Sequence, residues 1–314
     1  MTYNSPLVPQ RADPYIYKHT DGYYYFTGSV PAYDGIELRR SKTVNGLTDA
    51  EGVMVWHKHD SGIMSKHIWA PELHFLDGKF YLYFAAGEAE DIWKIRPYVL
   101  ECDGDPITGT WRELGMIQRA DDDIVSFTGF SLDATVFEHK GERYYIWAEK
   151  TSFGNGHLAS NLYIAKMESP WKLKTPGMLL TTPDYDWERI GHWVDEGPAV
   201  LIRNGKIFVT FSSSATGACY CMGMMEADEN ADLLDRNSWT KSRYPVLETD
   251  AEKGIYGPGH NSFTVAEDGE TVLCIYHARP YEKIVGDPLY DPNRHAHVME
   301  VTFGADGKPV FEYK

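Results

Sequence analysis

Three acidic residues, a histidine and a tryptophan recur at matching places along this chain. Counting back nine residues from the turn glycine of four out of five hairpin patterns gives Asp13, Trp69, Glu196 and His260. In one further copy of the pattern the count is eight, and the residue is Asp133. Carboxyl groups that lie close together raise one another's pKa, so one can hold a proton while another stays ionised. This set of residues predicts general acid and base chemistry.

The elements that would position these residues are five β-hairpin patterns. Each consists of a β-prone run, an X-Gly turn and a second run rich in aromatic or β-branched residues, as in "HFLDGKFYLYFAAG". The turn glycines are Gly22, Gly78, Gly141, Gly205 and Gly269, so the spacings are 56, 63, 64 and 64 residues. A repeat of this size that is built from strands is typical of a β-propeller.

The sequence therefore predicts an all-β fold, a five-bladed β-propeller, with residues 1–314 as a single domain. Outer strands are expected in "GIELRRS", "RPYVLEC", "SNLYIAKM", "CYCMGMMEA" and "AHVMEVTF", which allows five blades of four strands. A β-sandwich or jelly roll is the alternative, but such folds rarely give five nearly equal intervals. Because the innermost strands of a propeller line its channel, the five singled-out residues should surround one axial pocket.

Composition and charge narrow the classes of partner. The formal charge of −16 argues against nucleic acid and anionic membranes, and no apolar run is long enough to span a membrane. The four cysteines match no metal-binding spacing and predict free thiols, which suits a reducing compartment. Met1 leads into a polar stretch without a secretory leader, so a cytoplasmic protein is expected, although a leader removed beforehand would give the same sequence. The oligomeric state stays open.

Three carboxylates beside aromatic rings suit the cleavage of a glycosidic bond. One would act as base or nucleophile, a second as general acid, and a third would raise the pKa of the acid. Trp69 offers a flat apolar face for a sugar ring, or else belongs to the core. Asp195 adjoins Glu196, and strand alternation should turn Asp195 away from the axis.

Two further side chains have a structural alternative. Arg279 follows the return strand of the fifth hairpin, so it should come back to the end of the channel where the strand of His260 begins. It could instead form an ion pair that locks two blades together. His260 could likewise be a structural residue that bonds neighbouring blades.

Five segments in order, "RADPYIY", "HIWAPELH", "SLDATVF", "DEGPAVL" and "GPGHNSF", resemble glycoside hydrolase family 43. The resemblance implies a five-bladed propeller with an axial pocket and inversion at the anomeric carbon. It also implies that Asp13 is the general base, acting through a water, and that Glu196 is the general acid. Asp133 would tune the pKa of the acid and orient it.

The same resemblance implies roles for the remaining residues of the pocket. Trp69 and Arg279 would contact the substrate, with Arg279 also able to contact the catalytic carboxylates. His260 would lie beneath the pocket, in many members near a bound calcium or other ion that is held largely by waters. No cofactor is expected to be required for the chemistry.

Three activities are implied by the resemblance: α-L-arabinofuranosidase, β-xylosidase and endo-arabinanase. Because the chain ends at Lys314 without room for an extra domain, and because of the overall run of its motifs, we expect an arabinofuranosidase. It would be exo-acting on α-1,5-linked arabinan or arabino-oligosaccharides. The loops at residues 87–97 and 280–295 would decide between exo and endo action. A sugar-binding propeller without activity is the non-enzymatic alternative, but it would not need three carboxylates.

Overall fold

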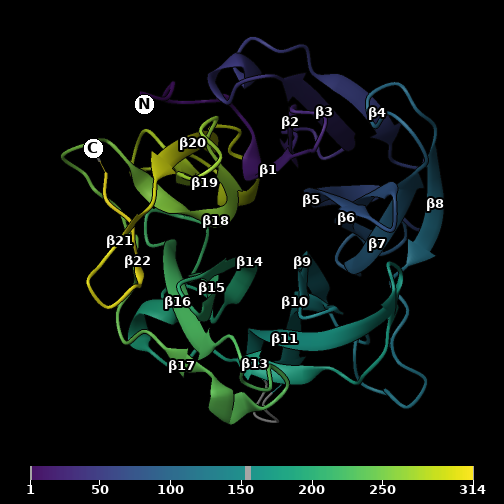
Figure 1. The fold of residues 1–314 in the computed structure, drawn as a ribbon. Helices are drawn as coiled ribbons and strands as arrows, with labels where there is room; N and C mark the ends of the chain where they lie inside the picture. Colours follow the sequence, from purple (N-terminus) through teal and green to yellow (C-terminus); the bar gives the residue numbers. More distant parts are fainter. Residues whose placement is uncertain (1, 153–156, 314) are drawn as a thin grey trace.

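Five β-sheets stand around a central axis as the blades of a propeller (Figure 1). The computed structural model describes residues 2–152 and 157–313. The all-β, five-bladed β-propeller predicted from the hairpin repeat is thereby confirmed. In each blade the first strand lies at the axis and the later strands follow outward (Figure 1).

The strands of each blade are as follows. Blade 1 contains β1 (Ala12–Lys18), β2 (Tyr24–Ser29), β3 (Gly35–Ser41) and β4 (Val53–His57), and blade 2 contains β5 (Lys66–Leu76), β6 (Lys79–Gly87), β7 (Arg96–Cys102) and β8 (Trp111–Met116). Blade 3 contains β9 (Ser131–His139), β10 (Glu142–Ser152), β11 (Leu158–Ser169), β12 (Lys172–Leu173) and β13 (Met178–Thr181). Blade 4 contains β14 (Asp195–Arg203), β15 (Lys206–Ser213), β16 (Cys221–Asp228) and β17 (Thr240–Lys241). Blade 5 contains β18 (Tyr256–Val265), β19 (Val272–Arg279) and β20 (His295–Glu300).

The remaining elements of the described chain are short. β21 (Thr302–Phe303) pairs with β22 (Pro309–Val310), and the helical segments are four 3₁₀ turns, η1 (Asn45–Leu47), η2 (Asp186–Glu188), η3 (Arg236–Ser238) and η4 (Pro288–Tyr290). Within the described ranges, no helix has the length and apolar character that crossing a membrane requires. All four cysteines carry free thiols, as predicted.

The start of the chain joins the last blade and closes the ring. The Leu7 N–H donates to the carbonyl of Ala296 on β20 at 2.8 Å, and the Ala296 N–H donates to the carbonyl of Val8 at 3.0 Å. Leu7 and Val8 are fully buried. Blade 5 therefore has three strands plus this short pairing, and blade 3 has five, so the prediction of four strands in every blade is wrong for these two.

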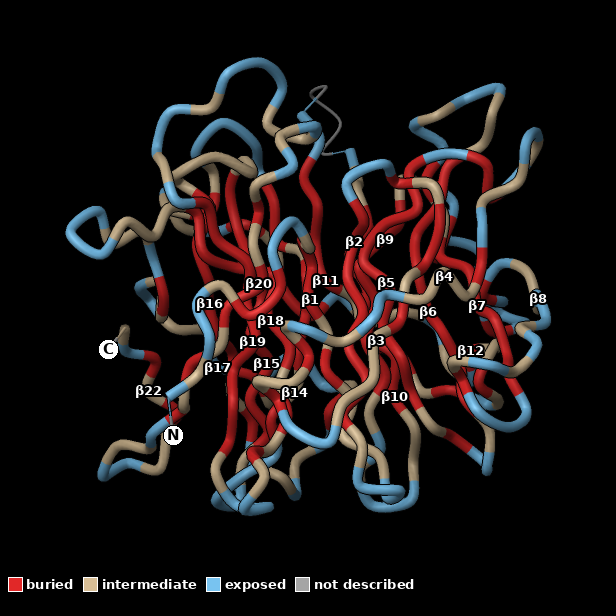
Figure 2. The backbone as a smooth tube through the Cα atoms, turned by 90° about the horizontal axis from the view of Figure 1, so that it is seen from above, coloured by how far each residue is buried: buried red, intermediate tan, exposed pale blue. Residues whose placement is uncertain are grey.

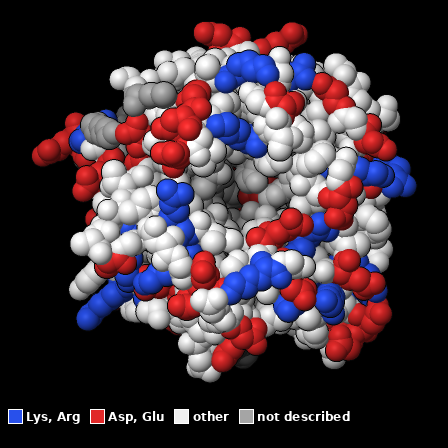
Figure 3. All heavy atoms as spheres, in the orientation of Figure 1, with Lys and Arg blue, Asp and Glu red and all other residues white. Residues whose placement is uncertain are grey.

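Apolar side chains fill the space between neighbouring blades. Tyr83 of blade 2 packs with Tyr145 and Trp147 of blade 3, while Ile16 of blade 1 packs with Leu273 of blade 5. Figure 2 shows that the strands are mostly buried and that exposed residues gather in the loops at both ends of the blades. The face seen in Figure 3 is hollowed at its centre, so side chains do not fill the whole axis.

The hairpin turns differ in length, and this difference sets the register of the inner strands. Residues 77–78, 140–141 and 204–205 form two-residue turns in which both residues have positive φ, as X-Gly sequences allow. The turns after β1 and β18 are longer. A given place on the inner strand therefore lies eight residues before the turn glycine in blades 2 to 4 and nine in blades 1 and 5.

Candidate active site

Every blade has an irregularity in pairing near the start of its inner strand. One residue there takes a left-handed backbone conformation, with φ of 52° at Asp13, 47° at Ala70, 49° at Asp133, 56° at Gly197 and 43° at His260. The pairing register of the inner strand shifts at the same places, as expected for β-bulges. Left-handed conformations are strained for residues other than glycine, and such strain is concentrated at functional sites.

The five residues found by counting back from the turn glycines occupy two neighbouring positions on the inner strands. Asp13, Asp133 and His260 occupy the bulge, whereas Trp69 and Glu196 stand one residue before it. Asp133 is therefore in register, and the count was offset in blades 2 and 4 because their hairpin turns are shorter. The structure still brings all five side chains to the wall of one cavity.

This axial cavity has a volume of about 480 Å³. Beyond the five predicted residues, it is lined by side chains that the sequence analysis did not single out, among them Trp93, Lys150, Trp193, Leu289 and Arg294. The predicted axial pocket is thus present, with carboxylates from blades 1, 3 and 4 on its wall.

Asp13 is surrounded by donors. Its Oδ2 accepts a hydrogen bond from the Ser29 hydroxyl at 2.5 Å, and its Oδ1 lies 3.3 Å from His260 Nδ1 and 3.4 Å from an Arg294 nitrogen. The Asp13 N–H donates to His277 Nδ1 at 3.1 Å. Burial acts to raise the pKa of Asp13, but His260, Arg294 and His277 outweigh it and hold this pKa well below its usual range. Asp13 is therefore ionised.

Glu196 and Asp133 have the opposite tendency. Burial raises the pKa of Asp133 to about 8, with the negative charges of Glu196 and Asp13 adding to the shift and His260 opposing it. Burial also raises the pKa of Glu196, and Asp13 adds to this, although His260 and a 2.9 Å hydrogen bond donated by the Tyr220 hydroxyl act against it. The site thus holds one carboxyl group whose pKa is lowered beside two whose pKa is raised.

His260 lies between these groups. Its Nδ1 is 3.3 Å from Asp13 and 3.6 Å from Asp133, and it is 8% exposed. Burial lowers the pKa of His260, but Asp13, Asp133 and Glu196 together raise it above the ordinary value. His277, which is also buried, has its pKa lowered to about 3 by burial and stays neutral, as its acceptance of the Asp13 N–H requires.

Asp195 points away from the cavity, as strand alternation predicts. It is fully buried, and its carboxylate accepts hydrogen bonds from Ser213 at 2.8 Å and Thr181 at 3.3 Å. Its Oδ2 also lies 3.6 Å from the Lys241 ammonium. Of the two neighbouring acids, Glu196 is the one on the cavity wall.

Trp69 belongs both to the cavity wall and to the core. Its ring stacks on His67 at 4.5 Å between centroids and meets the ring of Tyr33 edge-on at 5.8 Å. Trp93 lies 6.2 Å away, and Trp193 lines the cavity from the connection that precedes β14. Trp69 therefore lies in the core and on the cavity wall at once, and its contact with a sugar ring stays a prediction.

Arg279 is placed differently from the prediction. Its guanidinium donates to the carbonyls of Thr216 at 2.6 Å and Pro288 at 2.7 Å and lies 3.4 Å from Asp291, and it is not among the residues that line the cavity. Arg279 therefore ties the loop at residues 280–295 to blade 4, close to the locking role named as its alternative. The arginine beside the carboxylates is Arg294, just before β20.

Other residues of the site were also missed, and they share a position. Ser29 and His277 lie on the return strands that bring the chain back to the cavity, as does Lys150, whose Nζ sits 4.1 Å from the centre of the Phe130 ring. Counting forward from each turn glycine to the end of the return strand would have found these residues. Arg294 has a weaker signal, its place directly before the strand pattern "HAHVME".

The residues around His260 do not form a coordination shell. Across residues 2–152 and 157–313, no group of three or more His, Cys, Asp or Glu side chains is arranged to hold a metal ion. The Nδ1 of His260 faces two carboxylates, so this residue could offer an ion a single ligand. The ion expected near His260 stays a prediction.

The propeller fold, with carboxyl groups of opposite pKa shift in one cavity, is suited to a hydrolase that uses acid and base catalysis. The family model described as "Glycosyl hydrolases family 43" matches residues 3–309. The chain belongs to this family.

Individual relatives carry more specific names. The chain is 50% identical over 312 residues to a protein of Streptomyces avermitilis named extracellular exo-α-(1→5)-L-arabinofuranosidase, covering 99% of this chain and 63% of that relative. A protein of Streptomyces chartreusis with the same name is 50% identical over 287 residues, covering 91% of this chain and 85% of the relative. The crystal structure of an α-L-arabinofuranosidase from Lactobacillus brevis superposes with a TM-score of 0.91 at 51% identity, covering 99% of this chain and 98% of that one.

Proposed function

We propose that this protein is an inverting exo-acting α-L-arabinofuranosidase that removes terminal arabinose from α-1,5-linked arabinan or arabino-oligosaccharides. The single observation that carries the proposal is the opposite direction of two pKa shifts in one cavity, where the pKa of Asp13 is held well below its usual range while burial raises the pKa of Glu196. The names of the relatives at about half identity support arabinose as the sugar.

The chemistry follows from these two groups. Asp13 would take a proton from a water that attacks the anomeric carbon, since Arg294, His260 and Ser29 hold its carboxylate ionised and fixed in orientation. Glu196 would give its proton to the departing glycosidic oxygen, and the attack from the opposite face would invert the configuration. A proton lost by water and a proton gained by the leaving group balance the reaction.

Asp133 would act on the acid rather than on the sugar. It is buried on the same wall and favours its protonated form, and the Glu196 charge is one cause of its raised pKa. The interaction is mutual, so ionisation of either carboxyl group raises the pKa of the other. This coupling supports the tuning role expected for Asp133.

The loops named as decisive for exo action both contribute to the cavity. Trp93 comes from residues 87–97, and Asp287, Pro288 and Leu289 come from residues 280–295. Together with Trp69 they place apolar surface beside the carboxylates, which is suitable for one face of a sugar ring. We infer that these loops bound the cavity for a terminal residue, in keeping with the exo action named for two relatives.

The proposed setting of the enzyme differs from the cytoplasmic one first expected. Two relatives are named extracellular, which favours secretion and does not support the cytoplasmic prediction. An arabinose-containing glycan is the proposed partner in that setting. The net charge of −16 suits a neutral glycan better than a polyanion.

The test is hydrolysis of p-nitrophenyl α-L-arabinofuranoside, p-nitrophenyl β-D-xyloside and linear α-1,5-arabinan by wild type, Asp13→Ala and Glu196→Ala. We expect turnover of the arabinoside, its loss by a factor on the order of 10³ or more in Asp13→Ala, and a smaller loss in Glu196→Ala because nitrophenolate leaves without much protonation. The matched control is Asp77→Ala, since Asp77 stands at an exposed hairpin turn.

Product analysis completes the test. Arabinose should be the only early product from arabinan, and proton NMR should show the β anomer first. Turnover of the xyloside alone would reassign the substrate, and longer oligosaccharides as early products would reassign the action as endo. Sugar binding in calorimetry without any hydrolysis would indicate a binding propeller and overturn the proposal.

A further inference from the structure

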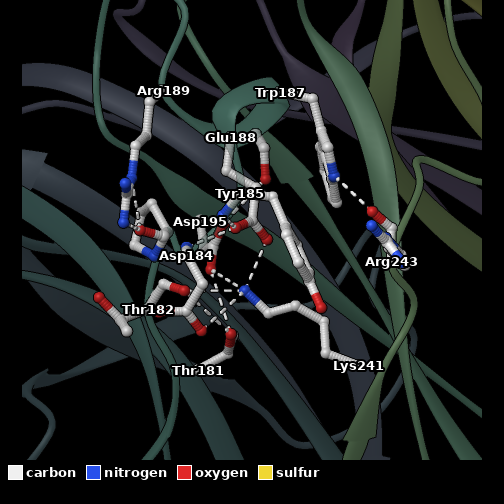
Figure 4. Close-up of polar contacts among 12 residues, drawn as sticks. Thr181, Thr182, Asp184, Tyr185, Trp187, Glu188, Arg189, Asp195, Lys241 and Arg243 are labelled. Atoms are coloured by element: carbon white, nitrogen blue, oxygen red, sulfur yellow. Dashed lines mark hydrogen bonds and ion pairs between the residues drawn. The ribbon is translucent and has the colours of Figure 1, made fainter.

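A second group of buried charges lies directly behind the proposed acid. The Lys241 ammonium points into a pocket formed by Thr182, Asp184, Glu188 and Asp195 (Figure 4). Its Nζ lies 2.6 Å from Glu188 Oε1, 2.8 Å from the Thr182 carbonyl, and 3.6 Å from each of Asp184 Oδ2 and Asp195 Oδ2. The ammonium of Lys241 is thus shared among the side chains of three acidic residues.

The members of this group differ in burial, and this shows which contacts matter. The side chains of Glu188 and Asp195 are 0% exposed and that of Lys241 is 9% exposed, whereas Asp184 is 47% exposed. An exposed ion pair contributes little, so the interactions with Glu188 and Asp195 dominate. Buried charges of this kind are costly unless they are paired and hydrogen-bonded.

Glu188 and Lys241 are held in place by further contacts. The other oxygen of Glu188 accepts the backbone N–H groups of Asp184 at 2.5 Å and Tyr185 at 2.6 Å, which fixes the η2 turn. The ammonium of Lys241 also lies 5.5 Å from the ring centres of both Tyr185 and Phe211. These contacts leave the ammonium little freedom.

The group spans a connection that builds part of the cavity wall. Residues 182–194 lead from β13 of blade 3 to β14 of blade 4, and His192, Trp193 and Val194 line the cavity. Lys241, on the outermost strand of blade 4, contacts both ends of this connection, at the Thr182 carbonyl and at Asp195. The residue after Asp195 is Glu196.

From this arrangement we propose that Lys241 is a positioning residue for the general acid. By holding Asp195 and the connection at residues 182–194, it fixes the start of β14 and hence the direction in which the Glu196 carboxyl enters the cavity. The inference rests on the proposed function, since it assigns Glu196 the role of acid. Lys241 itself does not touch the substrate cavity.

The effect should depend on the leaving group, because only poor leaving groups need the acid. In Lys241→Met we expect kcat on α-1,5-arabinobiose to fall about 10- to 100-fold, as misplacement of a catalytic group by roughly 1 Å can cause. On p-nitrophenyl α-L-arabinofuranoside the fall should stay within about threefold, since nitrophenolate leaves without general acid help. KM should change little on either substrate.

Two further variants separate positioning from folding. Lys241→Met with Glu188→Gln removes one positive and one negative charge, so it should recover the melting temperature of the wild type but not kcat on arabinobiose. Lys206→Met is the matched control, since Lys206 is also in blade 4 and pairs with Glu226 at 3.0 Å, away from the cavity. It should leave both rates unchanged.

The reference variant is Glu196→Gln. If Glu196→Gln shows leaving-group dependence and Lys241→Met loses both activities equally, or loses neither, the positioning role is refuted while the proposed function stands. Recovery of kcat on arabinobiose together with stability in the double variant would also refute it. If Glu196→Gln shows no leaving-group dependence, the assignment of the acid fails, and the inference fails with it.

Discussion

The hydrogen bond from Tyr220 to Glu196 should influence how the activity depends on pH. The Tyr220 hydroxyl donates to Glu196 Oε1 at 2.9 Å, which favours the ionised form and lowers the pKa of an acid that burial has raised. In Tyr220→Phe this bond is lost, while the ring can keep its stacking on His277, 5.5 Å away and inclined by 9°. The pKa of Glu196 should therefore rise further.

The size of the shift follows from the strength of the bond. A hydrogen bond to a charged group contributes roughly 1.5–3 kcal/mol, and one pKa unit corresponds to about 1.36 kcal/mol, so the pKa should rise by about 1–2 units. Because the proposed role of Glu196 requires its protonated form, activity should be lost as pH rises through this pKa. The basic limb of the profile should therefore move to higher pH in Tyr220→Phe.

The assay is kcat/KM against pH for α-1,5-arabinobiose, because this quantity reports the free enzyme and this substrate needs the acid. The matched control is Tyr145→Phe, since Tyr145 is fully buried and its hydroxyl has no hydrogen-bond partner among the described residues. Its profile should equal that of the wild type. A basic limb that stays in place or moves to lower pH in Tyr220→Phe would refute the assignment of Glu196 as the acid governed by this bond.

Two further variants test the surroundings of the base. In Arg294→Met the pKa of Asp13 should rise by roughly 1–3 units because a positive charge at 3.4 Å is lost. Because this pKa starts well below its usual range, the acid limb should move up into the lowest part of a kcat/KM profile on the nitrophenyl arabinoside measured from pH 2 to 8. In Gly197→Ala the new Cβ would lie 3.0 Å from His260 Cγ, in a backbone with φ of 56°, so kcat should fall by about tenfold or more along with stability.

Each of these two variants has a control variant that separates the expected effect on the active site from a general loss of stability. Arg279→Met removes another buried guanidinium, but one that holds the loop at residues 280–295, so it should lower the melting temperature and raise KM without moving the acid limb. Gly205→Ala imposes the same kind of strain, with φ of 75°, at a place where nothing lies within 4 Å of the new Cβ. Equal losses of activity in Gly197→Ala and Gly205→Ala would contradict the role given to the contact with His260.

The propeller could be predicted because one local pattern recurs in every blade. Two-residue turns such as those at residues 77–78 and 204–205 require positive φ, which Asp-Gly and Asn-Gly adopt readily, and the strands around them are long. β7 covers the whole of the segment "RPYVLEC". The outer strands β12 and β17 are two residues long, too short to leave a pattern, and the closure of the ring by residues 7–8 depends on a contact across almost the whole chain.

The carboxylates and His260 could be located from the sequence, and the arginine beside them could not. Asp13, Asp133 and Glu196 each lie near the start of an inner strand, eight or nine residues before the turn glycine. Arg294 follows a long loop, so its place relative to the repeat is not set by any turn. Arg279 lies only 15 residues before Arg294 in the sequence, but its guanidinium donates to the backbone carbonyls of Thr216 and Pro288. These bonds depend on the folded loop and cannot be read from the sequence.

The unequal proton affinities of the carboxylates follow from which blade supplies the positive charge. Arg294 and the charged form of His260 belong to blade 5 or its loop, as does the neutral His277, and all three residues lie within 3.4 Å of Asp13. Asp13 is on blade 1, which becomes the neighbour of blade 5 only when the start of the chain pairs with Ala296 and closes the ring.

Asp133 and Glu196 stand on blades 3 and 4, so of these three residues His260 alone is a leading influence on their pKa. The circular arrangement of the blades brings three acids to one cavity, but it places only Asp13 beside Arg294. The pKa of Asp133 and that of Glu196 are therefore set mainly by burial, which raises them. The proposed base and the proposed acid differ in pKa because the ring closes between blades 5 and 1, and Asp13 lies at this closure.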